Sequence, residues 1–272
     1  NEKHLKGFIS AWCMSQTQSR SALLLKERWQ SSNKCPEIKG KMKTEDMNPS
    51  IRIAPKAGCG YWTVTDWQEA KTSKDWHRMI QIFKDRMDFR YFGAINAMID
   101  ADEYQPTRRY GFAILALDRL LIETLHQFYK GFKESRGNGN PVVGSKRIIT
   151  NRGSNGQFFC EFLMQSSFVF KPFFESKPGA AIIFYQDIRC GILHAGETQK
   201  ATLIRVHKCT DDQNKLFEMI GYEEGIILYR DTFQCLLDQE YKEYCEKLKD
   251  PKEKVLRKNF VKKMGSICGY DY

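Results

Sequence analysis

The chain is organised around the segment Asp187-Ile188-Arg189-Cys190-Gly191-Ile192-Leu193-His194-Ala195-Gly196-Glu197. It follows the apolar run Ala180–Tyr185, and Pro178-Gly179 just upstream indicates that a helix starts there. Arg189 offers an always-charged, planar fork of donors that matches a phosphate group. His194 can exchange a proton near neutral pH. Beside a phosphodiester, the two side chains could move a proton and hold phosphoryl charge without a metal ion.

A second arginine–histidine pair lies upstream. Arg119 and His126 belong, with Glu123 and Lys130, to a polar stripe at steps of four, three and four residues. Such a stripe is usually a solvated or salt-bridged helix face. In a functional interpretation it lines a charged cleft, where Glu123 orients a catalytic group and Asp118 lies beside it. A chain with five histidines supplies about one such pair by chance, so spacing alone does not identify the functional one.

The composition is that of a basic chain with ample material for a folded core. Of 272 residues, 42% are hydrophobic and 13% aromatic, which argues against wholesale disorder and allows one large domain or a domain with an appendage. The formal net charge is +10 and the isoelectric point about 9.1. We therefore expect an anionic partner, nucleic acid before a membrane surface. The alternative is a lysine-rich face that contacts only solvent.

Cysteine and histidine spacing does not favour a metal site. None of the nine cysteines belongs to a C-x-x-C pair, and the His/Cys/Glu spacing of zinc deaminases and zinc hydrolases is absent. An odd number of cysteines without a secretory leader suggests reduced thiols. No apolar run is long enough to span a bilayer. We therefore expect a cytoplasmic protein with no metal, no cofactor and no membrane partner.

Residues 1–72 differ from the remainder and are predicted to form an N-terminal appendage. One short helix is expected at Ser21–Gln30, where leucines and a tryptophan give an apolar face. Two extended pieces are expected at Ile51–Ile53 and Tyr61–Val64. Because no chemical motif lies in these residues, the functional domain is predicted to be 73–272.

From Ser73 onward, apolar residues recur at helical spacing. Ser73-Lys74-Asp75 can cap a helix that ends near Asp102. The next helix is expected to start at Thr107, and its run Tyr110–Leu117 is apolar on nearly all sides. A helix of that kind lies in the middle of a bundle.

Three later segments also have helical patterns, and a polar, glycine-rich loop at Arg136–Asn155 precedes them. They are Gln157–Phe170, limited by Pro172; a helix capped by Asp231 and broken at Asp250-Pro251; and an amphipathic helix from Lys252 to about Ile267.

Two short segments interrupt this helical pattern. Ala201–Val206 and Gly225–Tyr229 are rich in β-branched residues, and the turn-prone Asp211–Asn214 lies between them. We predict that they pair as a small β-hairpin inserted among helices. The predicted fold is therefore mainly α.

The central segment and its context resemble the HEPN superfamily, whose members carry an Arg-x4-6-His pattern late in a helical bundle. Features of a family of bacterial HEPN proteins recur here in the same order. Gly111–Asp118 with Leu121–Leu125 resembles its long central helix, Phe184–His194 its catalytic helix, and Leu256–Met264 its closing helix. The resemblance covers roughly residues 75–268 and implies an HEPN-like helical bundle.

This resemblance implies a metal-independent endoribonuclease of a toxin–antitoxin or antiviral defence system. Arg189 and His194 would be catalytic, and the RNA 2′-hydroxyl would be the nucleophile, so that products end in a 2′,3′-cyclic phosphate or 3′-phosphate. HEPN domains commonly dimerise so that two Arg/His pairs meet in one cleft, which implies a homodimer. An antitoxin or a nucleotidyltransferase is a further partner that the resemblance suggests.

Glu123 and Asp118 would support the catalytic pair, and Lys200, Arg119 and His126 are candidates for RNA binding. One position departs from the family pattern. Many HEPN nucleases carry Asn, Asp or His directly after the arginine, whereas this chain has Cys190, which forms only weak hydrogen bonds. The alternative function is a catalytically inactive HEPN domain that binds RNA or another protein.

Overall fold

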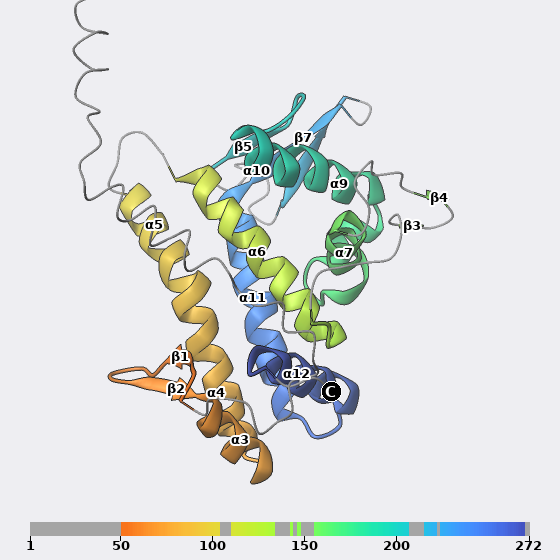
Figure 1. Ribbon diagram of the computed structural model, residues 1–272. Coiled ribbons are helices and arrows are strands. Elements are labelled where there is room, and N and C mark those ends of the chain that lie inside the picture. Colours follow the sequence, from red (N-terminus) through yellow and green to blue (C-terminus); the bar gives the residue numbers. More distant parts are fainter. Residues whose placement is uncertain are drawn as a thin grey trace, which may run out of the picture. The chain divides into compact units, whose positions relative to one another are not determined.

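The computed structural model describes residues 50–103, 110–133, 142–143, 146–147, 155–206, 215–221 and 224–269. These residues are mainly helical, as predicted, with three small sheets (Figure 1). No helix among them is both long and apolar enough to cross a membrane. The helix predicted at Ser21–Gln30, the start predicted at Thr107 and the turn Asp211–Asn214 lie outside the described residues.

Most helices lie in segments that were predicted to be helical, but those over Val64–Thr72 and Lys171–Glu175 were not predicted. The α-helices are α3 (Val64–Thr72), α4 (Trp76–Met87), α5 (Gly93–Glu103), α6 (Gly111–Lys130), α7 (Asn155–Glu161), α8 (Lys171–Glu175), α9 (Pro178–Ile183), α10 (Gly191–Ala195), α11 (Arg230–Lys249) and α12 (Lys254–Ile267). Three widened π-helical segments continue them: η2 (Asp88–Phe92), η3 (Phe162–Ser166) and η4 (Phe184–Cys190).

Several helix ends confirm their sequence signals. Asp75 caps α4, its carboxylate accepting from the Arg78 amide, and α11 ends before Asp250-Pro251. The cap predicted at Asp231 is wrong, because Tyr229 precedes α11 and Asp231 instead binds the Arg230 guanidinium at 3.0 Å. The helix predicted to reach Phe170 ends at η3, and Pro172 lies in the first turn of α8.

Helix α6 occupies the middle of the bundle, as its apolar run predicted (Figure 1). It packs against α5, α7, α11 and α12. Aromatic rings fill the layer between these helices: Phe83 of α4 lies 4.6 Å from Phe128 of α6 and 5.5 Å from Phe260 of α12, measured between ring centroids. Edge-on packing of this kind adds to the free energy gained by burying the rings.

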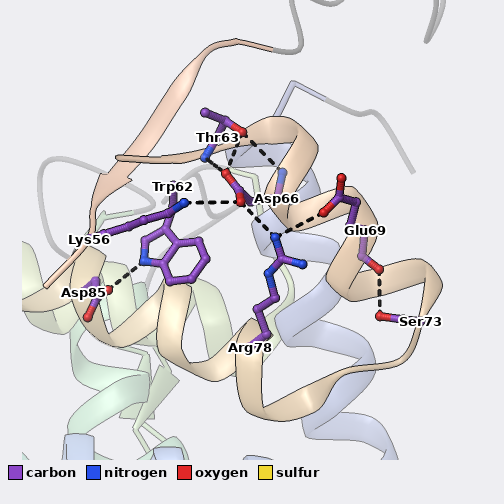
Figure 2. Close-up of polar contacts among 8 residues, drawn as sticks. All are labelled: Lys56, Trp62, Thr63, Asp66, Glu69, Ser73, Arg78 and Asp85. Carbon is purple, nitrogen blue, oxygen red and sulfur yellow. Dashed lines mark hydrogen bonds and ion pairs between the residues drawn. The ribbon is translucent and has the colours of Figure 1, made fainter. Parts of the chain in front are cut away.

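The segment before α3 forms a β-ribbon that is tied to the helices. Strands β1 (Arg52–Pro55) and β2 (Tyr61–Thr63) pair antiparallel, which confirms both predicted extended pieces. Figure 2 shows how Asp66 in the first turn of α3 accepts from the Thr63 amide at 2.8 Å and from Arg78 of α4 at 2.8 Å. Trp62 donates from its indole nitrogen to Asp85 at 2.6 Å.

These contacts place the domain boundary earlier than predicted. Residues 50–72 belong to the same compact unit as the later helices. Ile53, Val64 and Trp67 are buried in the same apolar core as the later helices. The prediction that residues 1–72 form one appendage is therefore wrong for residues 50–72. The sequence concealed this because three short elements contribute only a few core residues each.

The hairpin prediction is wrong in its pairing. β5 (Leu203–Arg205) runs parallel to β7 (Gly225–Tyr229), and the antiparallel neighbour of β7 is β6 (Phe217–Ile220), giving the order β5-β7-β6. A parallel pair needs a long connection between its strands, and here that connection contains β6. The predicted loop at Arg136–Asn155 contains a further short ribbon, β3 (Val142–Val143) with β4 (Lys146–Arg147).

Candidate functional site

One helix, built of α9, η4 and α10 in succession, carries the central segment. It begins at Pro178, as predicted, because proline needs no amide partner in a first turn. It ends at Gly196, whose φ of +72° lies in the left-handed region that glycine adopts without strain. The seven residues of η4 are wound as a π-helix, which is frequent at functional sites.

Arg189 is held against α6 rather than extended into solvent. Its side chain is 9% exposed, and its Nη2 lies 3.2 Å from Oε1 of Glu123. Its guanidinium carbon also lies 5.2 Å from the centroid of the Tyr185 ring. Burial raises the pKa of Tyr185 to about 12, although Arg189 acts to lower it. The structure therefore brings together Arg189 and its predicted supporting residue Glu123, with Tyr185 as a neighbour that the sequence did not reveal.

Arg119 shares the same carboxylate. Its Nε lies 3.4 Å from Oε1 of Glu123, so two guanidinium groups converge on one acceptor oxygen. Burial lowers the pKa of Arg119, and Arg189 lowers it further. Arg119 Nη1 and Arg189 Nε are buried and have no hydrogen-bond partner. The Arg119–Glu123–Arg189 cluster thus carries an excess positive charge and two unsatisfied donors, the conditions that favour an anion.

His194 lies exposed in the last turn of α10. Within the described part of the chain, no hydrogen bond or ion pair fixes its ring. Arg189 is buried against α6, whereas His194 is exposed, so the two side chains of one chain have different surroundings. Glu123 binds Arg189 and has no recorded contact with His194, so of its two predicted tasks the structure supports positioning the arginine.

Asp118 lies on a different side of α6 from this cluster. It is completely buried, and the Gln234 amide nitrogen, with that side chain turned to face it, donates to its carboxylate oxygens at 2.7 and 3.1 Å. Burial raises the pKa of Asp118 well above its ordinary value, while Arg230 acts to lower it. The structure does not bring Asp118 to Arg189 or His194, and its contacts are those of a residue that ties α6 to α11.

His126 is buried, which contradicts the prediction that it contacts RNA. Its side chain has no exposed surface, and its ring packs edge-on against Phe158 with centroids 4.5 Å apart. A neighbouring helix, α7, covers it and supplies Glu161, which pairs with Lys130 at 2.6 Å. The stripe is therefore a salt-bridged face rather than a solvated one, with the ion pairs Arg119–Glu123 and Lys130–Glu161.

We expect His126 to make the protein less stable in acid. Burial lowers the pKa of His126 from 6.5 to about 3, and the nearby charge of Lys130 contributes to the decrease. Between these two pH values the unfolded chain therefore binds one proton more than the folded chain. The free energy of unfolding then decreases with falling pH by up to about 1.4 kcal/mol per pH unit. From pH 7 to 5, wild type should lose about 2 kcal/mol more than His126→Leu in urea denaturation. In His77→Leu, where the histidine is exposed, the loss should equal that of wild type.

Lys200 closes the loop that follows the central helix. Its φ is +53°, and its ammonium group lies 3.3 Å from the carboxylate of Asp187, which is completely buried. Thr202 donates to the other oxygen of Asp187 at 3.0 Å. Lys200 keeps 55% of its side chain exposed, so it remains available to a ligand, although its ion pair has a structural role.

Gly191 allows this loop to lie against the central helix. A Cβ atom there would fall well inside van der Waals distance of the Glu197 carbonyl oxygen and close to the Gln199 backbone. We expect Gly191→Ala to destabilise the fold by about 1–3 kcal/mol in urea denaturation, because backbone must move to admit the methyl group. Gly111→Ala is the matched control, since nothing lies within 4 Å of its added atom, and it should be neutral or stabilising. Equal stability of the two variants would contradict the packing described.

The described residues offer neither a metal site nor a disulfide. They contain no group of three or more His, Cys, Asp or Glu side chains placed to hold a metal ion. The described cysteines, Cys190 among them, are free thiols. Comparison with protein-family models, curated proteins and solved structures found no match to the chain. The functional proposal therefore depends on the geometry of the Arg119–Glu123–Arg189 cluster and on the resemblance of the central segment.

Proposed function

We propose that the protein is a metal-independent endoribonuclease in which Arg189 binds the scissile phosphate and His194 transfers a proton. The observation that carries the proposal is the Arg119–Glu123–Arg189 cluster, where two buried guanidinium groups share a single carboxylate. A phosphate at its edge would supply the missing negative charge and accept from the unsatisfied donors. The resemblance to HEPN nucleases, whose arginine has this task, supports the same assignment.

The reaction needs only groups that the chain and RNA supply. His194 takes the proton of the RNA 2′-hydroxyl, and the O2′–phosphorus bond forms as the phosphorus–O5′ bond breaks. The proton then passes to the departing O5′, which leaves a 2′,3′-cyclic phosphate and a 5′-hydroxyl. Arg189 stabilises the charge that gathers on the non-bridging oxygens. Glu123 holds the guanidinium in place and is a positioning residue.

A homodimer is part of the proposal. Arg189 of one protomer is buried against α6 while its His194 is exposed, so we infer that the two groups that meet at one phosphate come from different protomers. A two-fold axis beside α10 would let the histidine of one protomer face the arginine of the other. Exposed apolar side chains near this helix, Leu193 at 44% and Leu203 at 51%, are suited to such a contact.

The test is incubation of the full chain with single-stranded RNA in excess chelator. We expect cleavage, with 2′,3′-cyclic phosphate on the new ends and no response to added Mg²⁺. Cleavage that requires a metal, or none under conditions in which the protein binds RNA, would contradict the proposal.

A non-catalytic RNA-binding HEPN domain is the second candidate. The exposed position of His194 in the last turn of α10 favours it, because no described residue holds the imidazole in an orientation for proton transfer. In this case RNA binding depends on salt and is unchanged in His194→Ala, and no new RNA ends appear.

A further inference from the structure

A second basic feature lies on α12, away from the central helix. A surface pocket of about 540 Å³ lies between α12, the first residue of α4 and Pro251. In Figure 1, α12 and α10 lie toward opposite ends of α6. Asn259 of α12 donates to the backbone oxygen of Tyr129 at 2.6 Å, which fixes α12 beside the C-terminal end of α6. The pocket is therefore separate from the Arg119–Glu123–Arg189 cluster.

Four cations line this pocket, and none of its lining residues is acidic. Lys254, Lys258 and Lys262 follow one another at intervals of four along α12, while Phe260 and Met264 on its other side are buried. The three lysines are exposed and form no ion pair with a described residue. Like charges four residues apart destabilise a helix by roughly 0.2–0.5 kcal/mol per pair. A bound anion would relieve that repulsion.

The floor of the pocket is aromatic. The Arg257 guanidinium carbon lies over the face of the Trp76 ring, 3.5 Å from its centroid. Trp76 is itself fixed by packing against Phe260, with centroids 6.1 Å apart. Arg257 Nε is buried without a hydrogen-bond partner. A planar cation on a rigid aromatic ring can stack a base and bind a phosphate in the same place.

We propose that this pocket binds single-stranded RNA, with a nucleobase against the Arg257–Trp76 pair and successive phosphates against the α12 lysines. The α-helical rise places Lys254, Lys258 and Lys262 about 6 Å apart, comparable to the separation of neighbouring phosphates in an extended strand. The choice of RNA as ligand rests on the proposed function. The pocket then holds substrate beyond the cleaved bond.

RNA fits the pocket better than other anionic ligands. An acidic peptide would pair with the lysines but would leave the Arg257–Trp76 surface without a planar partner. A vesicle surface would contact the exposed lysines but would leave the Arg257–Trp76 pair, which also lines the pocket, without a planar ligand. The combination of a row of cations with an aromatic and guanidinium platform is the one that single-stranded nucleic acid uses.

The test uses the full chain with His194→Ala, so that RNA is not consumed, and fluorescence anisotropy of a labelled oligouridylate over a salt series. We expect Lys254→Gln/Lys258→Gln/Lys262→Gln to weaken binding about tenfold at low salt and to reduce the slope of log affinity against log salt by about 2, for three phosphate contacts. Arg257→Lys should weaken RNA binding but leave the slope of log affinity against log salt unchanged, because lysine retains the positive charge but lacks the planar guanidinium group.

A matched control variant removes three lysine charges outside the pocket. Lys171, Lys215 and Lys242 are each close to a carboxylate three or four residues along the chain, so Lys171→Gln/Lys215→Gln/Lys242→Gln should leave affinity and slope nearly unchanged. Equal losses in both triple variants, or no RNA binding at all, would overturn the proposal. The proposal would also be overturned if the pocket variant lost binding to polyglutamate or to phosphatidylserine vesicles but kept its binding to RNA. Because binding is measured without turnover, the result is independent of whether the wild-type chain cleaves RNA.

Discussion

RNA cleavage is expected to fall about a thousandfold in Arg189→Ala and in His194→Ala, the largest change in activity that the proposed function predicts. Removing a proton-transfer group typically costs a factor of about 10²–10⁴, and removing a charge-stabilising donor about 10²–10³. The rate of release of 2′,3′-cyclic phosphate ends, followed in chelator, measures both losses. The two variants should also differ in binding, because only Arg189→Ala removes a phosphate contact.

Two variants of the same residue types serve as controls. His77→Ala and Arg52→Ala remove an exposed histidine and an exposed arginine outside the site, and both should cleave at the wild-type rate. Full activity in Arg189→Ala and His194→Ala together would show that neither group takes part in the reaction. His194 is exposed, so its removal should change stability little, whereas the fold of Arg189→Ala should be checked by its unfolding midpoint.

Mixing the two inactive variants tests the composite site. If the histidine of one protomer serves the arginine of the other, a mixed dimer of Arg189→Ala and His194→Ala has one intact Arg/His pair. We expect activity to return to a fraction of wild type after the two are unfolded and refolded together. Sites that lie wholly within one protomer would stay inactive in the mixture.

The sequence predicted the helices well because their apolar periodicity is strong. Positions such as Pro178 and Asp75 also carry local signals that need no tertiary partner. The pairing of β5 with β7 was predicted in the wrong direction because adjacent strands in sequence usually form hairpins, and the four-residue strand β6 gave too little pattern to be noticed.

In the candidate site, too, local spacing was predicted from the sequence and tertiary contacts were not. Spacing placed Arg119, Glu123 and His126 on one helix face, but it could not show that α7 covers one end of that face while η4 meets the other. Tertiary packing alone decides that His126 is buried while Glu123, on the same helix face, contacts Arg189. Glu123 and Arg189 are 66 positions apart in the sequence, so their contact could not be predicted from spacing. The π-helical winding of η4 left no signal that we recognised in the sequence.

Replacing Glu240 by alanine should destabilise the fold by about 4 kcal/mol, which is the largest loss of stability that we expect from a single substitution. Glu240 is completely buried on α11 and accepts four hydrogen bonds. Tyr129 of α6 donates at 2.5 Å and Ser167 at 2.6 Å, and the amides of Phe168 and Val169 donate at 3.3 and 2.9 Å. The carboxylate thus fixes the bend between η3 and α8, and its removal leaves several buried donors without partners.

Glu240→Gln separates hydrogen bonding from shape. The amide keeps the size of the side chain but turns one acceptor into a donor that faces other donors, so we expect a loss of about 2–3 kcal/mol. Glu246→Ala, on the exposed side of the same helix, removes only a solvent-screened surface pair with Lys249 and should leave stability nearly unchanged. Urea denaturation measures all three variants. A similar loss in Glu246→Ala would mean that helix propensity, not the buried carboxylate, sets the result.

A double-mutant cycle that combines Glu240→Ala with Tyr129→Phe measures the interaction energy between the two side chains. The phenol and the carboxylate interact directly, so their combined loss should be smaller than the sum of the separate losses by about 1–2 kcal/mol. Burial and the neighbouring Glu240 raise the pKa of Tyr129 well above its ordinary value, which keeps the hydroxyl proton available for donation at neutral pH. Strict additivity would show that α6 and α11 are joined there by packing alone, and that Glu240 acts only on the bend before α8.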